Sequence, residues 1–149
     1  MKRINLGCGG NILEGWENHD ADVDVTKPLP WFSDEVDYIL AEHLTEHLSS
    51  GDAIRFLKEC YRILKPGGVL RLLCPVLGTH LGRDKTFDLL VNHGHLIALN
   101  EDLMRVLLWC AGFNMLAIDK TPRREWDGHY KVIGLELDNL ETCRLEAMK

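Results

Sequence analysis

A glycine cluster directly behind a short apolar segment constrains the fold of this chain more than any other feature. The apolar segment is Ile4–Leu6, and the cluster reads Gly7-Cys8-Gly9-Gly10. Glycines after a first parallel strand let a ligand approach the backbone, because no Cβ atom stands in the way. Asp20 closes the next extended segment, where a carboxylate can accept hydrogen bonds from a ribose. This order predicts a sheet that binds a nucleoside-containing cofactor.

The rest of the chain alternates strand and helix signals, which is typical of an α/β fold with a parallel sheet. Further strands are expected at Glu17–Asp20, Asp22–Val25, Val36–Ala41, Val69–Cys74, Phe113–Ile118 and Lys131–Leu137. The last two are joined by a loop without a helical pattern, so we expect them to form an antiparallel pair at the edge of the sheet.

Two helices carry clear signals at their ends. Ser49 and Asp52 form a capping box for a helix that ends at about Leu64. Asn100 can cap a second helix over Glu101–Ala111, in which Trp109 is expected to face the core. Shorter helices are expected at Thr86–Asn92 and Glu141–Met148.

Size and charge narrow the class of protein. The 149 residues predict a single domain, and the net charge of −6 argues against binding nucleic acid by charge alone. No apolar run approaches the roughly 18 residues that span a bilayer, and the N-terminus does not read as a signal peptide, so no membrane partner is indicated and a cytoplasmic location is expected. The five cysteines form no C-x-x-C pair, which indicates neither a disulfide framework nor a cysteine zinc site.

Four segments in this order resemble the class I S-adenosylmethionine-dependent methyltransferases, and most closely their short bacterial members of the type-11 kind. They read L-G-C-G-G from Leu6, D-V-T-K-P-L-P from Asp24, V-D-Y-I-L-A-E-H from Val36 and L-K-P-G-G-V-L-R from Leu64. The resemblance covers nearly the whole chain. It implies a Rossmann-like sheet, mostly parallel with an antiparallel last strand.

The resemblance also implies a set of contacts to S-adenosylmethionine at the carboxyl ends of the strands, where open α/β sheets bind ligands. The backbone of Gly7, Cys8 and Gly9 would meet the methionine end, and Asp20 would hold the ribose hydroxyls. The adenine would be bound by Asp24 and by the Val25 amide. The methionine portion would be flanked by Ala41 and Glu42.

Two departures from the family pattern bear on function. Asn5 stands where many relatives carry an acidic residue, so a charged contact to the cofactor is lost. The first crossover, between Gly7 and Trp16, is too short for its usual helix, which we expect to be shortened or absent. One face of the sheet would then lack a helix, and a second subunit in a homodimer could cover it.

Two other cofactor or metal patterns fit less well. His43-Leu44-Thr45-Glu46-His47 matches the zinc-peptidase pattern H-x-x-E-H, but it follows a predicted strand at once and the same letters recur in the methyltransferases. His95 could supply half of a metal site with His93, although such histidines more often lie in a substrate loop or on the surface. We therefore expect no metal. A nicotinamide fingerprint fails because position 12 is Ile12 rather than glycine.

The sequence predicts methyl transfer from S-adenosylmethionine to a small acceptor whose identity stays open. A general base is needed only if the acceptor loses a proton as it attacks, and the candidates are His43, His47 and His95, with Glu42 beside them. The alternative is a non-catalytic module that binds the cofactor or a partner.

Overall fold

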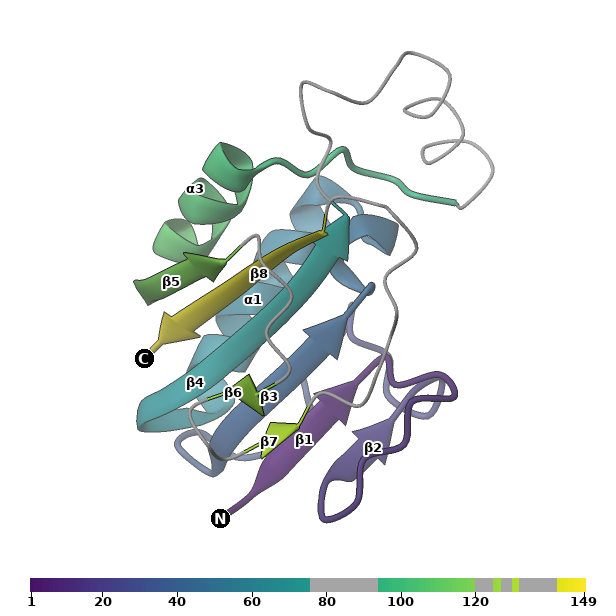
Figure 1. The fold of residues 1–149 in the computed structure, drawn as a ribbon, viewed down its shortest axis with the longest axis vertical. Coiled ribbons are helices and arrows are strands. Elements are labelled where there is room, and N and C mark those ends of the chain that lie inside the picture. Colours follow the sequence, from purple (N-terminus) through teal and green to yellow (C-terminus); the bar gives the residue numbers. More distant parts are fainter. Residues whose placement is uncertain (76–93, 120–124, 127–129, 132–141) are drawn as a thin grey trace.

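The computed structural model describes residues 1–75, 94–119, 125–126, 130–131 and 142–149. Its main sheet has six strands in the order β2-β1-β3-β4-β8-β5 (Figure 1). These are β1 (Arg3–Leu6), β2 (Glu17–His19), β3 (Val36–Glu42), β4 (Leu64–Pro75), β5 (Asn114–Asp119) and β8 (Thr142–Met148). A separate pair consists of β6 (Glu125–Trp126) and β7 (Tyr130–Lys131).

Strand direction confirms the predicted fold class. β2, β1, β3 and β4 run parallel to one another, and β8 lies antiparallel between β4 and β5. The described helices are η1 (Thr45–His47), α1 (Ser50–Ile63) and α3 (Glu101–Ala111). Residues 7–16, which join β1 to β2, contain no helix, as the length of this crossover predicted. No helix in the described ranges has the length and apolar character needed to cross a membrane.

Two of the secondary-structure predictions are wrong. Asp22–Val25 is not a strand, because the carboxylate of Asp24 accepts hydrogen bonds from the Thr26 amide and hydroxyl and bends the chain into a turn. The expected helix at Glu141–Met148 is instead strand β8, in which Leu145 and Ala147 are buried and Glu146 between them is partly exposed. The expected helix at Thr86–Asn92 lies outside the described residues, as does the expected strand after Lys131.

The main buried cluster, which joins the sheet to its helices, lies on one face of the sheet. Alternate strand residues, such as Ile4, Ile39 and Leu70, pack with Phe56 of α1 and Met104 of α3 in one buried cluster. α1 lies behind β4 in Figure 1 and contacts it. Apolar residues at every second strand position and at helical spacing in α1 therefore meet on the same side.

Both predicted helix starts are confirmed by their caps. Ser49 Oγ accepts from the Asp52 amide at 3.2 Å, and Asn100 Oδ1 accepts from the Leu103 amide at 2.8 Å. α3 ends at Gly112, whose φ of 105° is the left-handed cap conformation. Trp109 is 77% exposed rather than buried, because Met104, Leu107 and Leu108 form the face of α3 that meets the core.

The L-K-P-G-G segment, residues 64–68, follows α1 directly and turns the chain at the start of β4. A Cβ atom on Gly68 would lie 2.9 Å from the Lys65 carbonyl oxygen, so only glycine fits there. Gly67 has a φ of +78°, which also favours glycine. The irregular register between β3 and β4 falls at this turn, and from Val69 onward the two strands pair regularly.

Candidate functional site

The ends of three parallel strands bring the predicted cofactor residues to one edge of the sheet. Leu6 of β1 pairs with His19 of β2 on one side and with Ala41 of β3 on the other. The residues that follow these strands therefore leave the sheet together. The glycine loop, Asp20 and the end of β3 gather at the carboxyl edge, as expected for an open parallel sheet.

The glycine loop presents open backbone at its tip. Gly7 and Gly9 have φ values of +67° and +49°, which L side chains rarely adopt. A Cβ atom on Gly9 or Gly10 would meet nothing within 4 Å, whereas one on Gly7 would lie 3.1 Å from Leu44. Cys8 between them is buried, and that burial raises the pKa of its thiol. The tip of the loop can therefore be approached closely by a ligand.

Asn5 holds this loop rather than facing a ligand. Asn5 is 99% buried, and its side-chain amide donates to the Asn11 carbonyl at 2.9 Å and to Asn18 Oδ1 at 3.0 Å. Asn18 in turn binds the backbone of Leu13 through both ends of its side chain. A carboxylate at position 5 could not donate these bonds. The departure from the family pattern therefore has a structural cause in the short crossover.

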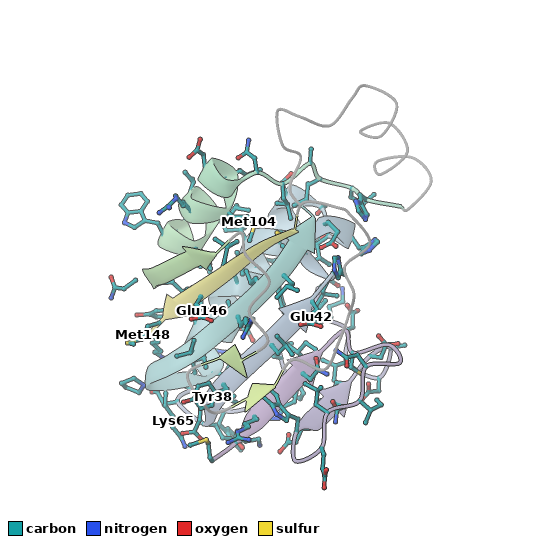
Figure 2. The ribbon with its side chains drawn as sticks, in the orientation of Figure 1. Tyr38, Glu42, Lys65, Met104, Glu146 and Met148 are labelled. Carbon is teal, nitrogen blue, oxygen red and sulfur yellow. The ribbon has the colours of Figure 1, made fainter. Side chains whose placement is uncertain are left out.

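A side-chain hydrogen bond connects the glycine loop to the end of β3. Asn11 Nδ2 donates to Glu42 Oε2 at 3.0 Å, and Glu42 is 92% buried. Glu42 lies near the arrowhead of β3, while Tyr38 and Lys65 lie toward the other end of the sheet (Figure 2). Asn11 was missed in the sequence analysis, and its only signal was a polar residue directly behind the glycines.

The three aspartates after β2 have different surroundings. Asp22 accepts from the Asp20 amide at 2.7 Å and from His19 Nδ1 at 2.6 Å, and the His19 bond is the main reason why its pKa is lowered. The bonds from Thr26 lower the pKa of Asp24. Asp20 is exposed, and its carboxylate has no hydrogen bond to the described part of the chain. Asp20 therefore carries the carboxylate that is best placed for an external ligand.

The loop that follows Asp24 and Val25 is held against α1 by a charged clamp. Arg62 donates to the carbonyl oxygens of Leu29 and Trp31, each at 3.0 Å, while Glu59 accepts from the Leu29 amide at 2.8 Å. Arg62 and Glu59 also bind each other at 2.7 Å, which lowers the pKa of Glu59 and raises that of Arg62. The clamp fixes the loop beside the candidate adenine site.

His43 directly follows β3 and has a strained backbone. Its φ of +50° lies in the left-handed region, and its amide donates to the Leu73 carbonyl at 2.8 Å. Its Nδ1 lies 3.1 Å from Glu46 Oε1, and this hydrogen bond raises the pKa of the imidazole. Glu46 is almost completely buried and was missed as a site residue, although the H-x-x-E-H pattern contained it.

The other two candidate histidines contact each other. The rings of His47 and His95 meet edge to face with centroids 4.9 Å apart. Residues 45–47 form only one 3-10 turn, so His43 and His47 do not share an α-helix face as the zinc-peptidase pattern requires. The structure thus brings His43 to Glu46 and His47 to His95, all close to the end of β3.

The residues present fit S-adenosylmethionine. Open glycine backbone, an exposed carboxylate after the second strand and the buried Glu42 lie along one sheet edge. The backbone can meet the methionine part of the cofactor, and the carboxylate can accept bonds from two ribose hydroxyls.

Comparison with known proteins agrees with this geometry. A family model described as a methyltransferase domain matches residues 13–72. No curated protein matches the chain as a relative. Among solved structures, an S-adenosylmethionine-dependent methyltransferase from Archaeoglobus fulgidus is 14% identical, with a TM-score of 0.69, and the match covers 99% of this chain and 86% of that one.

Two further solved structures share this fold. A methyltransferase from Methanosarcina mazei, also S-adenosylmethionine-dependent, is 16% identical with a TM-score of 0.69, over 99% of this chain and 92% of that one. The [4+2]-cyclase SpnF is 20% identical with a TM-score of 0.60, over 79% and 52%. The predicted resemblance is confirmed, while the fold alone does not identify a reaction.

Proposed function

We propose that this chain, a class I S-adenosylmethionine-dependent methyltransferase by its domain and its fold, transfers the methyl group to a small nucleophilic acceptor at the carboxyl edge of its sheet. One observation carries the proposal: the open glycine loop, the exposed Asp20 and the strained His43 lie along the same edge. The cofactor supplies an activated methyl group on a sulfonium. The chain's own residues bind it, orient the acceptor and accept a proton where the acceptor carries one.

Each predicted cofactor residue has a role that its surroundings support. The backbone of Gly7, Cys8 and Gly9 binds the methionine end, and the side chain of Asp20 accepts bonds from the ribose. Asp24 and the Val25 amide contact the adenine, in a loop that the Arg62 clamp holds in place. Ala41 and Glu42 flank the methionine portion, and the bond from Asn11 orients the Glu42 carboxylate.

Among the three candidate histidines, we assign His43 as the general base. It directly follows Glu42, and Glu46 fixes its Nδ1, which leaves Nε2 as the nitrogen that can take a proton from the acceptor. His47 and His95 pack against each other instead. Because methyl transfer is an in-line displacement, much of the rate comes from holding the acceptor in line with the methyl group.

Calorimetry with S-adenosylmethionine and with its demethylated product tests the cofactor assignment. We expect both compounds to bind. Absence of binding by either compound at millimolar concentration would refute the enzyme assignment. Binding without methyl transfer to any acceptor of a broad oxygen, nitrogen and sulfur panel would favour the alternative, a non-catalytic cofactor-binding module.

His43→Gln is expected to lower the turnover of an acceptor that loses a proton by about a hundredfold or more, because general bases contribute roughly 10²–10⁴ in rate. Glutamine keeps a polar side chain near Glu46 but cannot take a proton at neutral pH. Single-turnover methyl transfer measures the effect, and the affinity for S-adenosylmethionine, measured on the same samples, should stay within about twofold. Unchanged turnover would remove His43 from the mechanism.

We also propose that the chain forms a homodimer and works in the cytoplasm. The helices α1 and α3 both pack on the core face of the sheet, and no helix in the described ranges lies on the other face, although Leu40 and Leu73 of that face are buried within one chain. Cys60 and Cys110 are free thiols, which fits a reducing compartment. Sedimentation equilibrium should give twice the monomer mass of 17.0 kDa, and a monomer at all concentrations would contradict the dimer.

A further inference from the structure

We propose that Glu46, His47 and His95 form a binding site for a divalent transition-metal ion such as Zn²⁺, next to the cofactor edge of the sheet. One ligand atom from each of these residues lies within 4.8 Å of the other two. Two imidazoles and a carboxylate are a ligand set that Zn²⁺ and Fe²⁺ use in proteins.

The buried Glu46 carboxylate provides the first support. The residue is only 1% exposed, and its Oε2 has no hydrogen-bond partner in the described part of the chain. Its Oε1 accepts from His43 Nδ1 at 3.1 Å, which fixes the carboxylate orientation. A buried carboxylate oxygen without a partner costs free energy, and a metal ion would satisfy it.

His47 has the orientation of a metal ligand. Its Nδ1 lies 3.3 Å from the Gly94 carbonyl oxygen, to which it can donate. This bond places the proton on Nδ1 and the lone pair on Nε2. Metal-binding histidines commonly donate their other ring nitrogen to a backbone carbonyl in this way.

His95 is brought to the cluster by the backbone of the next two residues. The amides of Leu96 and Ile97 donate to the Glu46 carbonyl at 2.8 and 3.3 Å. The segment that carries His95 is thereby joined to the η1 turn that carries Glu46 and His47. Residues distant in sequence thus meet through main-chain bonds, which hold whether or not a metal is bound.

The distances allow a single ion. Ligand atoms that bind one Zn²⁺ tetrahedrally at about 2.0–2.2 Å lie roughly 3.3–3.6 Å apart. The three ligand atoms lie no more than 4.8 Å apart, so they reach this separation when the His47 and His95 imidazoles, both at least partly exposed, turn toward Glu46 by about 1 Å. Three protein ligands leave a fourth position for water or for a Lewis-basic atom of a ligand.

Calorimetric titration of Zn²⁺ into the metal-free full chain tests the site. We expect saturable binding of one equivalent, and at least a roughly tenfold weaker affinity in His47→Ala and in His95→Ala. Mg²⁺, which prefers oxygen ligands, should not bind at the same concentrations. Because neither cofactor nor acceptor is present, the result does not depend on methyl transfer.

Two control variants separate this site from other zinc-binding groups. His19→Ala removes an imidazole that pairs with Asp22, and Cys110→Ser removes an exposed thiol; both should bind Zn²⁺ like the parent chain. Glu46→Gln should weaken binding as the histidine variants do. If it does not fold, as judged by circular dichroism, the two histidine variants decide the result. Absence of stoichiometric Zn²⁺ binding, equal binding of Mg²⁺, or binding unchanged in His47→Ala and His95→Ala would overturn the proposal.

Discussion

Asp20→Ala is expected to weaken the binding of S-adenosylmethionine and of its demethylated product by about tenfold to a hundredfold. A hydrogen bond to a charged group contributes about 1.5–3 kcal/mol, and each 1.4 kcal/mol corresponds to a tenfold change in affinity. The Asp20 side chain is exposed and has no hydrogen bond to the described residues, so its loss should leave folding intact. Calorimetry with both compounds measures the effect.

Glu14→Ala is the matched control for this experiment. Glu14 is an exposed carboxylate in the same crossover, between the glycine loop and β2. Its removal changes the net charge equally but should leave cofactor affinity within about twofold, since interactions of a solvent-exposed charge are largely screened by salt. If Asp20→Ala and Glu14→Ala had the same affinity, the ribose assignment would be wrong.

Phe56→Ala is expected to lower the free energy of unfolding by about 3–5 kcal/mol, which is the usual loss for a buried phenylalanine. Phe56 is fully buried in α1, within the cluster that joins both helices to the sheet. Domains of ordinary stability unfold at a cost of only about 5–15 kcal/mol, so this single change removes a large part of the total. Urea unfolding followed by circular dichroism measures it.

Phe32→Ala provides the comparison for the core variant. Phe32 is the same residue type but is 83% exposed, so its truncation should change the free energy of unfolding by no more than about 0.5 kcal/mol. A loss below 1 kcal/mol for Phe56→Ala would mean that α1 does not pack on the sheet as described.

The sequence predicted the parts of the fold that local signals determine. Ser49 and Asn100 mark helix starts through bonds made within a few residues, and both starts are confirmed. The last strand was mistaken for a helix because Leu145, Glu146 and Ala147 are good helix formers. Their strand conformation comes from pairing with β4 and β5, which supplies backbone hydrogen bonds on both sides.

The exposure of Trp109 is likewise not determined by local sequence signals. Its spacing from Val106 fits one face of a helix. However, α3 carries large apolar residues on more than one face, so spacing alone does not identify the buried face. Only the position of α1 and the sheet decides that the face with Met104 and Leu108 is buried. Trp109 and Val106 consequently lie on the exposed side.

For the site, the sequence by itself determined which residues follow the parallel strands, because glycines and acids at strand ends are read directly from the chain. Gly7 and Asp20 were predicted in this way, whereas Glu42 was predicted from the resemblance to the methyltransferases. Tertiary structure alone decided what these residues contact. The bond from Asn11 to Glu42 and the meeting of Glu46 and His47 with His95 join segments far apart in the chain. No local pattern encodes such contacts, since they depend on how strands and turns pack in three dimensions.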